Sequence, residues 1–218
     1  MSTRSDVQPT EDAPAEREPE ATTGEVRMVG DKYQILRVRG RGGMGVVYEA
    51  ENTWTRRRVA LKVLAPGKET SPSRVQRFMA EARTASQVNH PHIVGVLDMG
   101  QDPTDGALYI VQEWLDGEDL RERLRREGKL DPAAALAIIL PVLRALAVAH
   151  ERGIIHRDIK PANIFLARTT DGEVVPKIID FGISKELGVQ TSLIETETGA
   201  FLGTPAYMSP EQLKNERP

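Results

Sequence analysis

The sequence predicts an α+β fold with two lobes: an antiparallel β small lobe with one helix, then a mainly helical large lobe. Between residues 33 and 112, short apolar runs of strand length are separated by turn residues, and one helical pattern interrupts them at 74–87. Between 113 and 218 the longest pattern is an apolar helix that starts at Asp131-Pro132, an N-cap followed by proline. Strands gathered in one part of a chain and helices in another are typical of this fold class.

The first 32 residues are expected to form a disordered acidic tail. Residues 1–30 carry seven acids, three arginines and three prolines, with almost no periodic apolar residues. Such a segment buries too little surface to offset the entropy of ordering it. A solvated leader is the simpler interpretation, and a docking or phosphorylated tail is the alternative. The hydroxyl residues that would serve the alternative are Ser2, Thr3, Ser5, Thr10, Thr22 and Thr23.

Composition excludes several classes of function. The net charge of −3 leaves no basic footprint for nucleic acid. The chain has no cysteine, which excludes disulfides and thiolate metal sites and fits a cytoplasmic location. The N-terminus has no apolar signal region, and the longest apolar run, Ala133–Leu140, is too short to span a bilayer. We therefore expect no membrane segment in these residues.

A glycine-rich stretch follows the first predicted strand, with glycines at positions 40, 42, 43 and 45. This spacing alone is a weak signal. The residues after it, 46–50, are rich in β-formers, and no Lys-Ser/Thr follows Gly45, which argues against a Rossmann turn and a Walker loop. We expect Gly40, Gly42, Gly43 and Gly45 to join two antiparallel strands as a flap over phosphates, because a side chain would block the approach of the backbone. An ordinary glycine-rich hairpin is the alternative.

A single lysine interrupts the next apolar strand. Lys62 lies in Val59–Leu64, and lysine is seldom buried without a partner. A solvent-facing strand lysine would be the ordinary interpretation, but its place behind the glycine hairpin favours a functional one. A capped helix over 74–87 follows, and Glu81 lies beside its apolar stripe, where it can pair with Lys62. The alternatives are a solvated Glu81 or a pairing role for Glu69.

The stretch His156–Asn163, followed by Asp180-Phe181-Gly182, holds the residue types that phosphoryl transfer needs. Asp158 can accept a proton from an attacking hydroxyl, and Lys160 can neutralise charge on the group in transfer. Asn163 and Asp180 offer hard oxygen ligands to Mg²⁺. A predicted hairpin around Asp171-Gly172 lies between them, so that both metal ligands flank one hairpin.

From Tyr33 onward these motifs resemble the catalytic domain of bacterial eukaryotic-like (Hanks-type) serine/threonine protein kinases. The resemblance implies ATP and Mg²⁺ as cofactors, proteins with serine or threonine as substrates, and Lys62 on the α- and β-phosphates. It also implies that Val47, Ala60 and Phe165 enclose adenine, with Gln112 behind them as gatekeeper. Backbone groups of Glu113 and Leu115 would then bind the adenine edge.

The segment from Asp180 to Glu211 is polar and rich in hydroxyls, which suits a switch between order and disorder. Arg157, directly before Asp158, is a natural partner for a phosphate. The spacing to Gly203-Thr204-Pro205 resembles bacterial relatives and predicts autophosphorylation at Thr196 and Thr198, with Thr191 and Ser192 as weaker candidates. The resemblance also implies that Thr204 bonds the catalytic Asp and Lys. Self-association for phosphorylation in trans is a further expectation.

The sequence ends seven residues after Glu211, where related domains continue through several helices. We therefore expect an incomplete large lobe, 113–218, in a domain truncated at its C-terminus, and partial loss of cover for one apolar face of the long helix. That predicted face consists of Leu136, Ile139, Leu140, Leu143, Leu146 and Ala147. The leading prediction is a protein serine/threonine kinase. The alternatives are a weak or inactive nucleotide-binding or interaction module and, less favoured, a small-molecule phosphotransferase.

Overall fold

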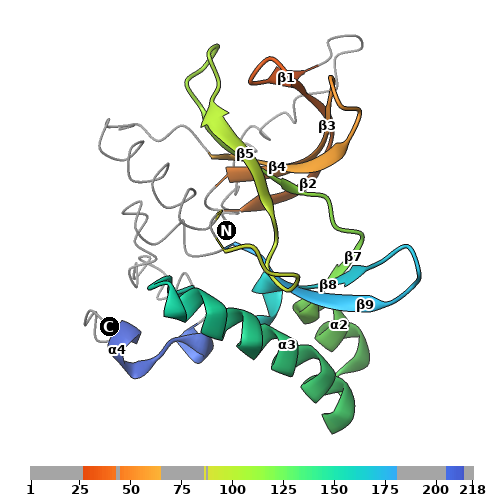
Figure 1. Cartoon of the computed structure of the whole chain (residues 1–218), viewed down its shortest axis with the longest axis vertical. Helices are drawn as coiled ribbons and strands as arrows, with labels where there is room; N and C mark the ends of the chain where they lie inside the picture. The colour runs from red at the N-terminus through yellow and green to blue at the C-terminus, as the bar shows by residue number, and fades with distance from the viewer. Residues whose placement is uncertain (1–26, 43–44, 65–85, 87, 181–204, 214–218) are drawn as a thin grey trace, which may run out of the picture.

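The computed structural model describes residues 27–42, 45–64, 86, 88–180 and 205–213. These residues form a large antiparallel sheet in the first half of the chain, and a small sheet with helices in the second half (Figure 1). This arrangement confirms the predicted two-lobed α+β class. The predicted helix over 74–87, with Glu69 and Glu81, lies outside the described residues apart from Ser86.

The first sheet has the strand order β1-β2-β3-β4-β6-β5, with every neighbouring pair antiparallel. Its strands are β1 Met28–Val29, β2 Tyr33–Gly42, β3 Gly45–Asn52, β4 Arg58–Leu64, β5 Val96–Gln101 and β6 Leu108–Glu113. Successive side chains of a strand point to opposite faces. Tyr48 and Ala50 of β3 therefore share one face with Leu61 of β4, and all three are buried in the core of this lobe. Val47 and Lys62 lie on the other face.

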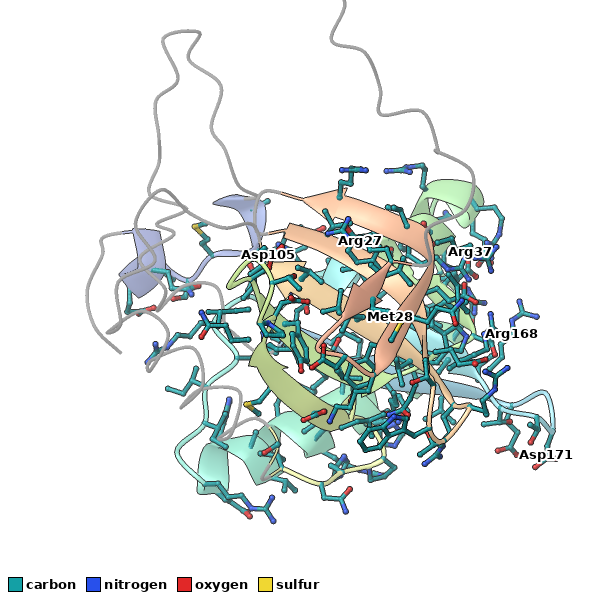
Figure 2. The ribbon with its side chains drawn as sticks, turned by 90° about the horizontal axis from the view of Figure 1, so that it is seen from above. Arg27, Met28, Arg37, Asp105, Arg168 and Asp171 are labelled. Atoms are coloured by element: carbon teal, nitrogen blue, oxygen red, sulfur yellow. The ribbon has the colours of Figure 1, made fainter. Side chains whose placement is uncertain are left out.

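The predicted tail, 1–32, is too long at its C-terminal end. Met28 and Val29 form β1, which pairs with β2, and Val29 is buried in the lobe core. Arg27 directly precedes Met28 at the start of this strand (Figure 2), and its guanidinium lies 5.5 Å from the centre of the Tyr48 ring. Two short apolar residues are enough for a strand here because β2 already offers an edge on which they can pair. Residues 1–26 lie outside the described part.

The second lobe is built on a three-stranded sheet of order β7-β8-β9, with β7 Gly117–Asp119, β8 Ile164–Arg168 and β9 Val174–Ile178. The β8–β9 hairpin turns at Asp171-Gly172, as the sequence predicts, and Gly172 has a φ of +83°. The helical elements of this half are α2 Leu120–Glu127, α3 Pro132–Glu151, a 3₁₀ turn at Pro161–Asn163, a second at Pro205–Tyr207, and α4 Pro210–Leu213.

The long helix α3 begins as predicted, with the Asp131 carboxylate accepting hydrogen bonds from the backbone of Ala133 and Ala134. It continues through Pro141, so the proline does not end the helix. The face that packs into the lobe core consists of Ile138, Val142, Ala145 and Ala149. The face containing Leu136 and Leu143, for which the sequence predicts partial loss of cover, is largely exposed, at 55% and 54% for these two residues. Because both faces of α3 are apolar, the sequence pattern does not indicate which face packs inward.

Because of this composition, α3 has the length and apolar character that a membrane span requires, alone among the helices of the described residues. Core helices of soluble proteins meet the same test. Ala145 and Ala149 of this helix are fully buried against the second sheet and its neighbours.

The two lobes meet where residues 92–94 run beside β9. Ile93 forms a parallel bridge with Ile178, the Val94 amide donates to the Ile178 carbonyl at 2.9 Å, and the Ile178 amide donates to the His92 carbonyl at 2.8 Å. The side chain of Ile178 is fully buried in the large-lobe core. A segment that leads to β5 of the first sheet is thus joined to the second sheet by backbone hydrogen bonds.

We predict that Ile178→Ala lowers the free energy of unfolding by about 2–5 kcal/mol, because it leaves a cavity in a core that cannot fully collapse. Leu97→Ala, at a position that is 54% exposed in β5, is the matched control and should change it by no more than about 0.5 kcal/mol. Urea unfolding followed by circular dichroism measures both. Equal effects of the two substitutions would contradict the assigned packing.

Candidate active site

The loop that carries Asp158 is held in place by a buried histidine. The His156 ring is 1% exposed, its Nε2 lies 3.0 Å from the Ile179 carbonyl, and its Nδ1 accepts from the Asp158 amide at 3.2 Å. Burial lowers the pKa of His156, and the neutral tautomer with its proton on Nε2 satisfies both contacts. The residue between them, Arg157, has a φ of +61°, a conformation that non-glycine residues seldom adopt. The histidine therefore stabilises a strained loop next to Asp158.

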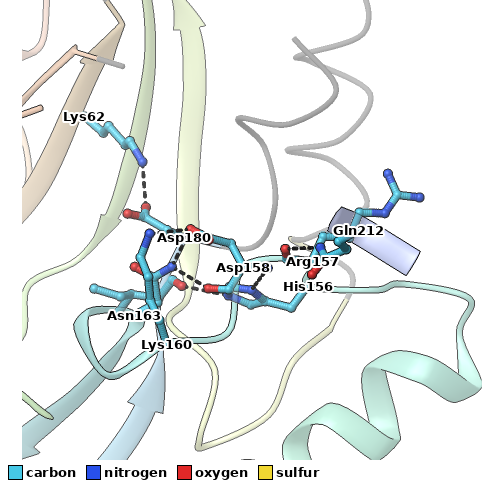
Figure 3. Close-up of polar contacts among 9 residues, drawn as sticks. Lys62, His156, Arg157, Asp158, Lys160, Asn163, Asp180 and Gln212 are labelled. Atoms are coloured by element: carbon cyan, nitrogen blue, oxygen red, sulfur yellow. Dashed lines mark hydrogen bonds and ion pairs between the residues drawn. The ribbon is translucent and has the colours of Figure 1, made fainter. Parts of the chain in front are cut away.

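Asp158, Lys160 and Asn163 form a contiguous polar group (Figure 3). The Lys160 ammonium donates to Asp158 Oδ2 at 2.9 Å. The Asn163 amide nitrogen donates to the same oxygen at 2.9 Å and to the Asp158 carbonyl at 2.7 Å. Proline at position 161 starts the 3₁₀ turn that brings Asn163 back to Asp158. The three side chains that the sequence assigned to transfer chemistry thus lie together.

Lys62 and Asp180, 118 residues apart in the chain, form an ion pair of 2.7 Å between Nζ and Oδ1 (Figure 3). Lys62 lies in β4 of the first sheet, opposite Val47 of β3. Asp180 follows β9 of the second sheet and has a φ of +57°. Such a conformation in a non-glycine residue is costly and typical of functional sites. The contact brings a side chain of each lobe to one point.

The oxygen atoms near this point fit a magnesium ion. Asn163 bonds Asp158 through its amide nitrogen, and Asp180 bonds Lys62 through Oδ1. Among the described residues, Oδ1 of Asn163 and Oδ2 of Asp180 take part in no hydrogen bond. An amide and a carboxylate oxygen are ligands that Mg²⁺ takes together with phosphates and water. Within the described ranges there is no cluster of three or more histidine, cysteine, aspartate or glutamate side chains that could hold a metal. The set suits a metal that arrives with phosphates.

The residues expected around adenine lie near the lobe junction. Val47 and Ala60 share the face of the first sheet that carries Lys62, and Phe165 lies in β8. Glu113 ends β6, and Leu115 follows in the connection to β7. The Glu113 amide donates to the Gly95 carbonyl, so its remaining backbone group for a ligand is its own carbonyl.

The side chain of Glu113 has a role that the sequence did not indicate. Its Oε1 accepts from Lys177 Nζ at 2.7 Å and from the Gly95 amide at 2.8 Å. Lys177 lies in β9, three residues before Asp180. This ion pair links the end of the first sheet to the strand that delivers Asp180.

A second residue that the sequence analysis missed is Gln212. Its side-chain nitrogen donates to the Arg157 carbonyl at 2.7 Å (Figure 3). Ser209 and Gln212 also bond each other's backbone amides, at 3.1 and 3.4 Å, in the reciprocal pattern of a capping box. The Ser-x-x-Gln spacing is a sequence signal for a helix start, but it gives no sign of the contact between Gln212 and Arg157, 55 residues earlier.

Within the glycine stretch, Gly40 pairs with Val47 and Gly42 with Gly45, so the expected hairpin is present. Gly45 has a φ of +145°, and a Cβ on it would come within 2.1 Å of the Val63 carbonyl oxygen. Glycine is therefore required there by backbone packing. Several predicted site residues lie outside the described ranges and stay predictions: Gly43, Glu81, Thr196, Thr198 and Thr204.

Comparison with known proteins gives one consistent family. Residues 33–218 match the protein kinase domain family. A probable serine/threonine-protein kinase of Streptomyces coelicolor is 44% identical over 195 residues, covering 88% of this chain and 28% of that protein. Serine/threonine-protein kinase PknB of Mycobacterium leprae is 40% identical over 190 residues, covering 86% of this chain and 30% of that protein. The chain thus spans less than a third of the length of these curated relatives.

Among solved structures, a mutant form of the kinase domain of PknI from Mycobacterium tuberculosis superimposes with a TM-score of 0.68 at 29% identity. The match covers 90% of this chain and 70% of that one. Given the fold, the grouped side chains at the lobe junction and the family match over residues 33–218, the chain belongs to the protein kinase family, with bacterial serine/threonine kinases as its relatives.

Proposed function

We propose that this chain transfers the γ-phosphoryl group of ATP to serine or threonine hydroxyls of proteins, in a Mg²⁺-dependent reaction. The observation that carries the proposal is the contact between Lys62 and Asp180, which lies beside the group formed by Asp158, Lys160 and Asn163 (Figure 3). A cation for phosphates, a base for a hydroxyl and two oxygen ligands for a metal are the parts that this reaction requires.

In the proposed reaction, the substrate hydroxyl oxygen forms a bond to the γ-phosphorus while the bond from that phosphorus to the β–γ bridging oxygen breaks, and ADP leaves. The hydroxyl proton passes to the Asp158 carboxylate. Lys160, already 2.9 Å from Asp158 Oδ2, is placed to neutralise charge on the transferring group. Lys62 orients the α- and β-phosphates, and the Gly40–Gly45 hairpin covers them.

Asn163 and Asp180 are the residues that would hold the metal. When bound, Mg²⁺ would neutralise charge on the phosphates. The hydrogen bonds from Asn163 to Asp158 tie the metal ligand to the base, so that both move as one group. Nucleotide binding without transfer is the competing function, and the substitution of Asp158 separates the two.

Asp158→Asn should lower kcat for phosphorylation of a protein substrate by at least about 100-fold, because the amide cannot accept the hydroxyl proton. Binding of ATP should be retained, since Asp158 contacts the hydroxyl rather than the nucleotide. Transfer of labelled phosphate measures the first effect, and calorimetry the second. Asp171→Asn, at the tip of the β8–β9 hairpin (Figure 2), is the matched control. Wild-type protein that binds ATP but transfers nothing would favour the binding module.

Asp180→Asn should raise the Mg²⁺ concentration that gives half the maximal rate by roughly tenfold or more, because an amide is a weaker ligand than a carboxylate. The substitution also removes the negative charge that pairs with Lys62. Rates measured across a Mg²⁺ titration at saturating ATP test this. An unchanged midpoint would remove Asp180 from the metal site.

We further propose autophosphorylation at Thr196 and Thr198, in trans between two copies. Arg157, directly before Asp158, supplies a guanidinium for such a phosphate. Peptide mapping by mass spectrometry after incubation with ATP and Mg²⁺ should find phosphate on these threonines, with Asp158→Asn as the unmodified control. The initial rate per molecule should rise with protein concentration. Phosphate transfer to a protein substrate with neither threonine modified would contradict this prediction.

A further inference from the structure

Glu49, in the middle of β3, is a carboxylate surrounded by arginines. It is 3% exposed, and its Oε2 accepts from Arg37 Nε at 2.6 Å and from Arg39 Nε at 3.1 Å. The other oxygen, Oε1, accepts from a terminal nitrogen of Arg58. Three guanidiniums from β2 and β4 thus converge on one buried acid. We call these four residues the Glu49 cluster.

The charges of the Glu49 cluster oppose separation of Glu49 from its three arginines. Burial by itself raises the pKa of Glu49, but hydrogen bonds from Arg58 and Arg37 outweigh burial and hold the pKa below its usual value. Glu49 is therefore ionised at neutral pH. A buried charge that loses its partners is strongly unfavourable. Movement of β2 away from β3 at this point would uncover that charge.

The Glu49 cluster also contacts the connection between the lobes, through Trp114. The Trp114 ring lies next to two of its arginines, with the Arg39 guanidinium carbon 4.8 Å and that of Arg58 4.9 Å from the ring centre. Guanidinium groups stack on aromatic faces through cation–π attraction. The Trp114 ring nitrogen is fixed in turn by the Asp116 carboxylate at 2.9 Å. Arg39 and Arg58 therefore tie the first sheet to the residues that follow β6.

Arg39 connects these contacts to the proposed nucleotide site, because it lies next to the glycine hairpin. Arg39 directly precedes Gly40, the first residue of the glycine hairpin, and Gly40 lies opposite Val47. Glu49 lies opposite Ala60 and two residues after Val47, so it shares the sheet face that carries Ala60 and Lys62. The cluster thus lies at the base of the hairpin, on the side expected to face the nucleotide.

We propose that the Glu49 cluster, through Arg39 and its contact with Trp114, sets the position of the glycine hairpin over the nucleotide phosphates. Arg39 and Glu49 are positioning residues that act through the hairpin backbone, and they contact no reacting atom. This inference rests on the proposed function, since it needs a nucleotide below the hairpin. The alternative is a cluster that only stabilises the sheet.

The two roles differ in which ligand they affect. A hairpin over the phosphates contributes to binding of ADP but little to binding of adenosine, which has none. A role in sheet stability alone would change the unfolding midpoint and leave the ratio of the two affinities unchanged. The experiment therefore measures the dissociation constants of adenosine and of ADP with Mg²⁺, together with the urea midpoint, for each variant.

The variants are Arg39→Ala, Arg39→Lys and the matched control Arg56→Ala. Arg56 lies in the connection between β3 and β4, is 74% exposed in its side chain and pairs with Glu51. We expect Arg39→Ala to weaken ADP binding by roughly three- to tenfold, with adenosine binding and the urea midpoint like those of the control. Arg39→Lys keeps the charge but loses the planar stack, so it should fall between Arg39→Ala and wild type.

A second readout uses the tryptophans, of which the chain has two. Trp54→Phe leaves Trp114 as the single reporter, and ADP with Mg²⁺ should change its fluorescence in that background but not when Arg39→Ala is added. Equal losses for adenosine and ADP, or none, would overturn the positioning role while leaving the proposed function standing. Wild-type protein that binds neither ligand would overturn both.

Discussion

The ion pair between Lys62 and Asp180 is the contact on which the rest of the site depends. It joins two sheets that form from different parts of the chain, and it exists only if β4 and the end of β9 are both placed correctly. The surrounding structure serves that placement. Residues 92–94 align β9, the Glu113–Lys177 pair ties β9 to the end of β6, and the His156 ring bonds the carbonyl of Ile179, directly before Asp180.

Local pattern was enough to predict much of this structure. The glycine hairpin, the strand with Lys62, the Asp131 cap and the β8–β9 turn each depend on residues within a few positions of one another, and the structure has all of them. The 3₁₀ turn likewise brings Asn163 to Asp158 over a short distance. Motif recognition then supplied what spacing could not, because no local rule connects Lys62 with Asp180, 118 residues later.

The failures also have physical causes. Val29 was assigned to the tail because its burial depends on pairing with β2, and the face of α3 that packs inward was missed because both faces are apolar. The sequence analysis assigned no role to Glu49, since its arginines come from two other strands. The spacing of Ser209 and Gln212 is a helix-start signal, but it does not indicate that Gln212 donates a hydrogen bond to the Arg157 carbonyl. In each case the partner is distant in sequence, and composition gives no sign of it.

The contacts of residues 92–94 with β9 have a mechanical consequence. Among the described residues, the chain passes between the two sheets at two places: around Gly95, between the Ile178 contacts and β5, and at 114–116, between β6 and β7. Two bodies connected at two points retain one easy motion, a rotation about the line through those points. Within the part of the chain that the structure describes, Gly95 and the 114–116 segment therefore define a pivot axis about which the lobes can open and close.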